Sequence, residues 1–193
     1  MQDCGINGAR SRLACLDPRG SERCGMAWWA ALLVIAIAFW AGPGQAQEVK
    51  ALGAFGDWRA FALDGKGGKT CYMISQPKKD EGNYSKRGKI YAMVTHRQSD
   101  KVRNEVSFWA GYRYKDSSQV DVAIDGKSFV LYPHEEIAWT PDSASDRSLV
   151  AAMKAGRDMV VTGTSSRGTV TKDTYSLIGF SKAYQSIDGA CPD

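Results

Sequence analysis

The sequence predicts an all-β fold: an antiparallel β-sandwich or a barrel-like domain with one or two short helices, placed after an N-terminal signal peptide. Short runs rich in Val, Ile, Thr and aromatic residues alternate polar and apolar positions, as strands with one buried face do. Gly, Asp, Asn and Pro separate these runs at close intervals, which is typical of antiparallel β-sheet proteins. Only two segments place apolar residues at helical spacing.

The N-terminal segment has the order of a secretory signal peptide. Residues 26–41 (MAWWAALLVIAIAFWA) are apolar and uncharged, arginines precede them, and Gly44-Gln45-Ala46 follows with small residues where cleavage is determined. The run is shorter than the roughly 18–20 apolar residues that a bilayer span prefers. We therefore expect residues 1–46 to be removed and residues 47–193 to form the β domain. An uncleaved membrane anchor, and a translation start at Met26 instead of Met1, are the alternatives.

The first half of the expected domain contains four strands after a short lead-in at residues 47–55. A glycine-rich turn at 64–69 and a polar connection at 77–88 separate strands that we place at 58–63, 70–76, 89–97 and 105–114. The last of these carries aromatic residues on both faces. That arrangement predicts either burial on both sides or an exposed aromatic patch.

The second half begins with the cleanest alternation in the chain, at residues 119–124. Asp125-Gly126 is a favoured two-residue hairpin turn, so residues 128–132 are expected to return as its partner. A helix is expected from Ser145 or Asp146 to Gly156. The remaining expected elements are a short strand at 136–139, a hairpin of 159–165 with 169–177 through Ser166-Arg167-Gly168, and a weaker helix at 179–187.

Cleavage of the leader would leave two cysteines, Cys71 and Cys191. In an exported domain such a pair predicts one disulfide, which would tie the end of the chain to an early strand. Two unpaired thiols are the alternative. The pair supplies too few ligands for a structural metal site, and we expect no metal and no cofactor.

The charge of the expected domain is mildly basic. Leaving out residues 1–46 gives 21 Lys and Arg against 18 Asp and Glu, a net charge of +3. This excess is too small to indicate nucleic-acid binding. Basic residues do cluster at 78–89, which indicates either a solvated loop or a contact with an acidic surface.

No motif for catalysis is complete in this sequence. The run GKGGKT at residues 65–70 has Leu63 where a phosphate loop needs its first glycine, and His134-Glu135-Glu136 has Ala138 where a zinc-protease helix needs its second histidine. A Gly-x-Ser-x-Gly elbow for a serine nucleophile is also lacking. We therefore predict a protein that is not an enzyme, with a hydrolase as the least favoured alternative.

Aromatic and basic residues provide the better functional candidates. Core filling and cross-strand pairing are the ordinary roles of the aromatic residues. If they face solvent, they could form a patch that binds peptide, glycan or membrane. The candidate patch comprises Lys78, Lys79, Lys86, Arg87, Trp109, Tyr112, Arg113 and Tyr114.

Several segments together resemble the invasion-associated locus B family of exported proteins of Gram-negative bacteria. Their order and spacing carry the resemblance: Gly56-Asp57-Trp58, residues 71–77 (CYMISQP), 101–106 (KVRNEV), 153–156 (MKAG), 163–168 (GTSSRG) and 173–180 (DTYSLIGF). The resemblance implies a β-rich domain in the periplasm, associated with the outer membrane or secreted. It also implies a link to host-cell entry in pathogenic relatives, and it supplies no catalytic residue.

The resemblance and the residues together predict a non-enzymatic envelope protein that acts as a binding or interaction module. Its expected partner is an envelope or host-surface protein or a glycan, with peripheral attachment to the outer membrane as a further expectation. A structural or stress-related periplasmic factor without a dedicated ligand is the alternative.

Overall fold

A computed structural model describes residues 48–192. Eleven strands form one sheet in which every neighbouring pair is antiparallel, in the order β1-β2-β3-β5-β6-β9-β8-β7-β10-β11-β4. The first strands are β1 (Val49–Phe55), β2 (Trp58–Gly65), β3 (Gly68–Ser75), β4 (Lys79–Gly82), β5 (Tyr91–Arg97) and β6 (Val102–Trp109). The rest are β7 (Val120–Ile124), β8 (Lys127–His134), β9 (Ile137–Trp139), β10 (Asp158–Thr164) and β11 (Val170–Ser176), with helices α2 (Ser143–Ala155) and α3 (Phe180–Ala190).

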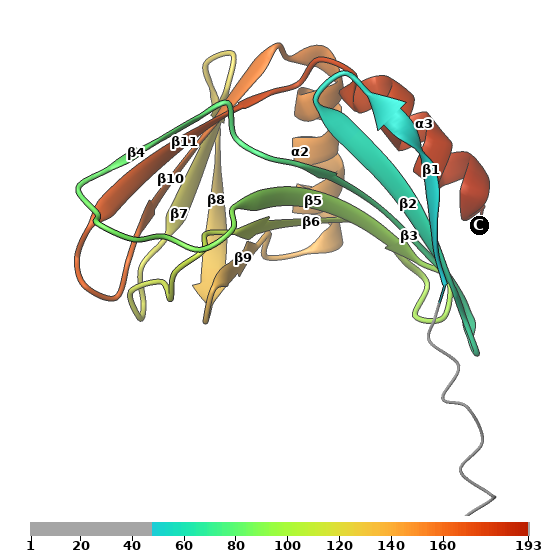
Figure 1. The fold of residues 1–193 in the computed structure, drawn as a ribbon, viewed down its shortest axis with the longest axis horizontal. Helices are drawn as coiled ribbons and strands as arrows, with labels where there is room; N and C mark the ends of the chain where they lie inside the picture. The colour runs from blue at the N-terminus through green and yellow to red at the C-terminus, as the bar shows by residue number, and fades with distance from the viewer. Residues whose placement is uncertain (1–47, 193) are drawn as a thin grey trace, which may run out of the picture. The chain divides into compact units, whose positions relative to one another are not determined.

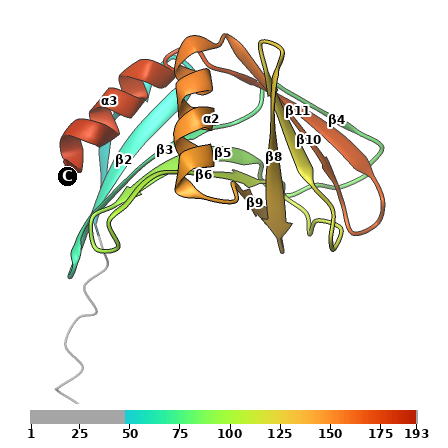
Figure 2. The ribbon, with the colours of Figure 1, turned by 180° about the vertical axis from the view of Figure 1, so that it is seen from behind.

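The sheet is strongly bent, and the two helices cover its inner face. Figure 1 shows β7, β8, β10 and β11 at one end of the sheet, β1, β2 and β3 at the other, and α2 between the two ends. Figure 2 shows α2 and α3 on the same side of the sheet, where α2 contacts β6 and α3 contacts β1, β2 and β3. Because the strand order begins at β1 and ends at β4, the sheet is open and does not close into a barrel.

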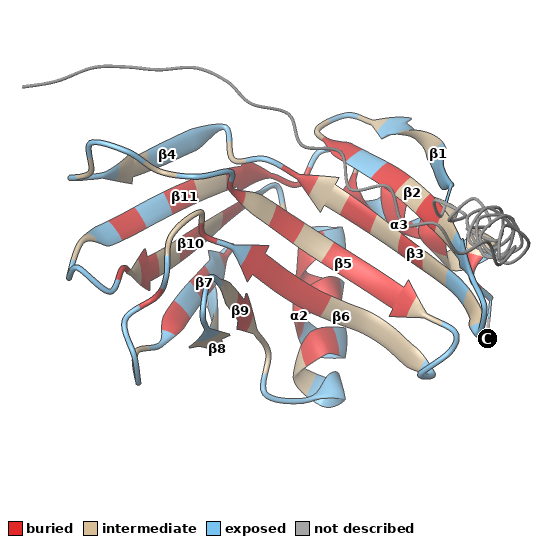
Figure 3. Cartoon of the chain, turned by 60° about the horizontal axis from the view of Figure 1, so that its bottom comes forward, coloured by how far each residue is buried: buried red, intermediate tan, exposed pale blue. Residues whose placement is uncertain are grey.

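The core forms because the apolar positions of the strands alternate. Val120, Val122 and Ile124 of β7 are buried while the residues between them are exposed. Figure 3 shows buried residues alternating with exposed ones in the first part of β11, and with intermediate ones in the first part of β5. Trp58 on β2 and Phe180 on α3 pack edge to face with ring centroids 4.9 Å apart, so the aromatic core joins the sheet to its helical cover.

The all-β prediction is confirmed, and most predicted elements have observed counterparts. Two strands were not predicted: β1 lies in the expected lead-in, and β4 lies in the expected polar connection. Both are edge strands that pair on one side, and β4 (KDEG) has no apolar residue to indicate a strand. Helix α2 begins earlier than predicted because Asp142, whose side chain accepts a hydrogen bond from the Ser145 backbone N–H, is its N-cap.

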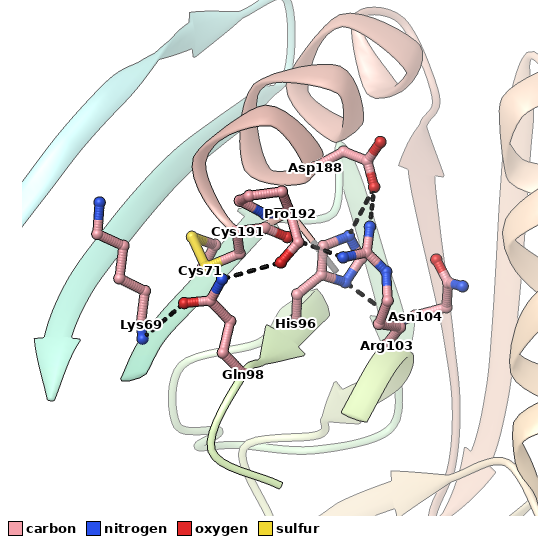
Figure 4. Close-up of a disulfide and its surroundings, with 9 residues drawn as sticks. All are labelled: Lys69, Cys71, His96, Gln98, Arg103, Asn104, Asp188, Cys191 and Pro192. Carbon is pink, nitrogen blue, oxygen red and sulfur yellow. Dashed lines mark hydrogen bonds and ion pairs between the residues drawn. A yellow bond between two sulfur atoms is a disulfide. The ribbon is translucent and has the colours of Figure 1, made fainter. Parts of the chain in front are cut away.

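The predicted disulfide is present and fastens α3 to the sheet. Cys71 of β3 and Cys191, at the end of α3, are both fully buried and bonded to each other. Figure 4 shows the neighbouring side chains that hold the same end of the chain. Arg103 donates to the Cys191 carbonyl oxygen at 2.8 Å and to the Asp188 carboxylate, and Gln98 donates to the Pro192 carbonyl oxygen at 2.9 Å.

The predicted signal peptide lies outside the described residues, so the structure leaves it as a prediction. Within residues 48–192, neither helix is long and apolar enough to cross a membrane.

Candidate ligand-binding groove

A surface groove of about 550 Å³ lies where three loops meet. The loops are the β4–β5 connection, the β6–β7 connection and the β10–β11 turn, at one end of the sheet (Figure 1). We call it the cationic groove; its lining consists of Asn83, Tyr84, Ser85, Lys86, Arg87, Gly88, Gly111, Tyr112, Arg113, Ser165, Ser166, Arg167, Thr169 and Thr171.

Backbone hydrogen bonds hold the three loops together. The Gly88 N–H donates to the Gly111 carbonyl oxygen, and the Ser166 N–H donates to the Arg113 carbonyl oxygen, each at 2.8 Å. Gly111 has a φ of 72°, and a Cβ atom there would lie 2.6 Å from the Gly88 carbonyl oxygen. Only glycine therefore allows the first two loops to approach this closely.

A buried ion pair lies beneath the groove. The two terminal nitrogens of Arg87 donate to the two carboxylate oxygens of Asp173 on β11, each at 2.6 Å, and Arg87 Nε donates to the Ala110 carbonyl oxygen at 2.7 Å. The side chains are 4% and 6% exposed. Burial alone would lower the pKa of Arg87, but the hydrogen bonds and the charge of Asp173 raise it on balance, so the guanidinium stays charged.

Two tyrosines flank the Arg87 guanidinium. Its central carbon lies 4.9 Å from the ring centroid of Tyr112 and 5.5 Å from that of Tyr84, within the range of cation–π contacts. The Tyr112 hydroxyl is 2.6 Å from the Thr171 hydroxyl, and the Tyr84 hydroxyl donates to an Asp80 carboxylate oxygen at 2.5 Å. These contacts fix the orientation of both rings in the wall of the groove.

The lining is cationic and contains no Asp or Glu. Arg113 forms an ion pair with Glu135 at 3.1 Å and a longer one with Asp116 at 3.8 Å. Lys86 and Arg167 are exposed, and among residues 48–192 no carboxylate lies within ion-pair distance of either. The groove is therefore suited to attract a negatively charged group.

The structure divides the predicted aromatic and basic patch. Lys86, Arg87, Tyr112 and Arg113 all line the groove. Lys78 and Lys79 lie outside it and form ion pairs, each at 2.8 Å, with Asp57 and Glu81 respectively.

Two members of the predicted patch are not solvent-facing. Tyr114 is 4% exposed, and its ring packs edge to face on Tyr112 at 5.2 Å. Arg87 is buried by its pairing with Asp173. The predicted strand at 105–114 ends at Trp109 in the structure, so strand alternation does not decide which way Tyr112 and Tyr114 face.

Burial raises the pKa of Tyr114 well above its ordinary value, which keeps the phenol neutral.

Trp109 belongs to a second surface, on the outer face of the sheet. Cross-strand pairing places Trp109 opposite Ile137, and Trp139 opposite Tyr132. Trp109 and Tyr132 are 39% and 52% exposed, while Phe108 and Ala138, on the other face, are buried. We call Trp109, Tyr132, Ile137 and Trp139 the outer aromatic patch.

The remaining groove residues were not predicted as a site. Tyr84, Ser166 and Arg167 were recognised only as members of a polar connection and of a hairpin turn. Pairing between β4 and β11 is what carries residues 83–88 to the turn near position 167, and β4 has no sequence signal.

A smaller cavity of about 350 Å³ lies beside the disulfide. His96 lines it, is 1% exposed, and lies with Nε2 3.7 Å from an Asp188 carboxylate oxygen. The other histidine of the described segment, His134, is exposed at the end of β8. Within residues 48–192, no three or more His, Cys, Asp or Glu side chains are grouped to hold a metal ion.

Comparisons with known proteins identify the family. The sequence model of the invasion associated locus B (IalB) protein family matches residues 58–188. A comparison with curated proteins gives no match. Among solved structures, the chain is similar to the crystal structure of invasion associated protein b from Bartonella henselae, with 20% sequence identity and a TM-score of 0.49 over 72% of this chain and 96% of that one. Because the family match spans well over half of the sequence, the chain belongs to the invasion associated locus B family.

Proposed function

We propose that the chain is a non-enzymatic binding protein of the bacterial cell envelope and that the cationic groove is its binding site. The observation that carries this proposal is the convergence of three loops on a groove whose lining has no carboxylate and includes two exposed cations without an ion-pair partner among residues 48–192, Lys86 and Arg167. Loops held by a rigid sheet are where binding residues concentrate in β-sheet proteins. The outer aromatic patch is the competing surface, because exposed aromatic side chains also mark interaction sites.

The proposed location is the periplasm, with secretion or peripheral attachment to the outer membrane as the alternatives. The leader-like segment at residues 1–46 supports export. The buried Cys71–Cys191 disulfide supports an oxidising compartment, because disulfides persist outside the cytosol. The family's name further motivates a proposed link to host-cell invasion in pathogenic relatives.

The proposed partner is an envelope or host-surface macromolecule that carries negative charge. Attraction to exposed cations speeds the encounter with such a partner and orients it before close contacts form. The buried Arg87–Asp173 pair makes the wall of the groove rigid, which lowers the entropy cost of binding.

Site-specific photo-crosslinking in cells tests the choice of surface. A photoreactive amino acid replaces Ser166, in the groove, or Tyr132, in the outer aromatic patch; both positions are exposed. We expect a discrete crosslinked product from position 166 and none from position 132. Products from position 132 alone would move the site to the outer aromatic patch. Products from neither would favour a structural envelope factor without a dedicated ligand.

A further inference from the structure

The residue types that line the groove restrict the class of ligand further than the charge of the groove alone does. The lining contains Gly, Ser, Thr, Asn, Tyr, Lys and Arg, and no Ala, Val, Leu, Ile, Met, Phe or Trp. The core of a protein–protein interface is more apolar than its rim and takes its energy from apolar or aromatic anchors seated in dry pockets. This groove offers no aliphatic pocket for such an anchor.

Hydroxyl and amide groups take the place of apolar side chains. Asn83, Ser85 and Ser166 are exposed at the groove, and Thr169 is partly exposed. Hydroxyls both donate and accept hydrogen bonds, and an amide side chain does the same with separate atoms. A sugar ring, which is bordered by hydroxyl groups, matches a surface of this kind.

Tyr84 and Tyr112 add the apolar component that a sugar needs. A pyranose ring has C–H faces that pack against aromatic rings, and tyrosine combines an apolar ring with a polar tip. Both rings are already held, since the Arg87 guanidinium contacts each of them, at 5.5 Å from the Tyr84 centroid and 4.9 Å from the Tyr112 centroid. The orientation of the tyrosines is therefore set before a ligand arrives.

The cations of the groove that lack an ion-pair partner within the described residues favour a negatively charged saccharide rather than a neutral one. Three carboxylates that contact groove residues already have partners: Asp173 pairs with Arg87, Asp80 accepts from Tyr84, and Glu135 pairs with Arg113. The charges of Lys86 and Arg167 remain available at the groove. We propose that the cationic groove binds an anionic saccharide, with Lys86 and Arg167 pairing with its charged groups and Tyr84 and Tyr112 packing on its rings. This inference rests on the proposed function and names the ligand class of the same site.

Isothermal titration with three polymers tests the ligand class. The probes are sulfated dextran, uncharged dextran of the same length, and poly-glutamate of matched charge. We expect sulfated dextran to bind most tightly and uncharged dextran to bind much more weakly. If poly-glutamate binds as tightly as sulfated dextran, the inference is overturned, because binding would then depend on the charge of the polymer and not on its sugar rings.

Matched variants test the groove residues. Lys86→Gln with Arg167→Gln removes two groove cations, and Lys66→Gln with Lys127→Gln removes two exposed cations that lie outside the groove. We expect the groove pair to weaken binding of sulfated dextran roughly tenfold and the control pair to leave it unchanged. Equal losses in both pairs would show a general surface effect and contradict the assignment.

A second matched comparison tests the aromatic contact. Tyr84→Leu removes a groove ring, and Tyr132→Leu removes an exposed ring elsewhere. Weaker saccharide binding in the first variant alone is the expected result, and equal binding in both would contradict the packing role. If position 166 crosslinks to a protein while no saccharide binds, the ligand class is wrong and the proposed function stands. If neither occurs, both fail.

Discussion

Arg87 shows how a residue in a polar loop can become part of the interior. The sequence places it in a basic cluster, which predicted a surface cation. In the structure its side chain is 4% exposed because Asp173, 86 residues further along the chain, satisfies both terminal nitrogens. Nothing in the local sequence indicates so distant a partner, so charge patterning alone could not have predicted the burial.

Removing one member of this ion pair should be costly. Arg87→Ala leaves the buried Asp173 carboxylate without its partner, so we expect the free energy of unfolding to fall by about 3–5 kcal/mol. The double change Arg87→Met with Asp173→Leu should cost less than the single change, because it buries no unpaired charge. Urea unfolding measures both. Arg59→Ala, at an exposed position, is the control, with an expected change within about 0.5 kcal/mol. A loss for Arg87→Ala no larger than the control's would show that the pair does not stabilise the fold.

Helix α2 depends on a carboxylate that reaches the sheet. Asp146 accepts a hydrogen bond from the buried Val106 N–H of β6 at 2.9 Å and another from the Thr140 hydroxyl at 2.6 Å. The sequence predicted Asp146 as one of two possible helix caps. The structure gives that role to Asp142 and uses Asp146 to join the helix to β6. Sequence pattern located this helix but could not assign the tertiary partner of its first turn.

We expect Asp146→Ala to lower the free energy of unfolding by about 1–3 kcal/mol, because the Val106 N–H would stay buried without an acceptor. Asp146→Asn keeps an acceptor and should cost less. Denaturant titration compares the two, and equal losses would mean that the hydrogen bond to Val106 contributes little.

The same residue predicts a pH dependence. Burial raises the pKa of Asp146 above its ordinary value of 3.8. A group with a higher pKa in the folded state stabilises the fold below its unfolded pKa, and this contribution is lost as the pH rises through the folded pKa. The stability of the wild type relative to Asp146→Asn should therefore fall as the pH rises above the ordinary carboxyl pKa of 3.8. A relative stability that rises with pH in this range would show that the pKa is lowered instead.

Helix α3 is the other element that tertiary contacts fix in place. Its buried face packs on β1, β2 and β3, and the disulfide bridges a sequence separation of 120 residues. Chain-entropy reasoning gives a bridge of this span about 3–5 kcal/mol, through restriction of the unfolded chain.

We therefore expect the double variant Cys71→Ala with Cys191→Ala to lose about 3–5 kcal/mol of unfolding free energy. Guanidinium unfolding measures this loss as a lower midpoint concentration. Reductant should shift the wild type toward the variant and leave the variant unchanged. A wild type that is equally stable with and without reductant, once thiol titration shows the bond to be broken, would contradict this role.

The edge strands mark the limit of sequence prediction at the scale of elements. Central strands such as β7 and β10 were predicted because burial imposes alternation on their sequences. Strands β1 and β4 pair on one side and bury few side chains, so their sequences are under weaker constraint. The pairing of β4 with β11 builds the groove. Strand β4, which was not predicted from the sequence, therefore completes the candidate site.

For the whole molecule, the disulfide and the fold class were predictable because composition, alternation and cysteine count report on global properties. The groove was predictable only in part, since its lining spans positions 83 to 171 and is assembled by long-range pairing. Lys86, Arg87, Tyr112 and Arg113 were identified by residue type. Their meeting with Ser166 and Arg167 depends on the strand order.

Export of the protein stays a prediction, because residues 1–46 lie outside the described residues. N-terminal sequencing of the protein recovered from the envelope should begin near Gln47. Its intact mass should rise by about two mass units on reduction, as one disulfide opens. A protein that retains residues 1–46 would contradict cleavage, and an unchanged mass would contradict the bridge in the exported form.

The claim that the cationic groove is the binding surface is tested most directly by combining the crosslinker at position 166 with charge removal. The photoreactive residue is placed in two backgrounds, Lys86→Gln with Arg167→Gln and the control Lys66→Gln with Lys127→Gln. If the groove cations recruit the ligand, the crosslinked product is lost in the first background and retained in the second. An equal yield of product in both backgrounds would show that the groove cations do not recruit the ligand, and the groove would not be the binding surface.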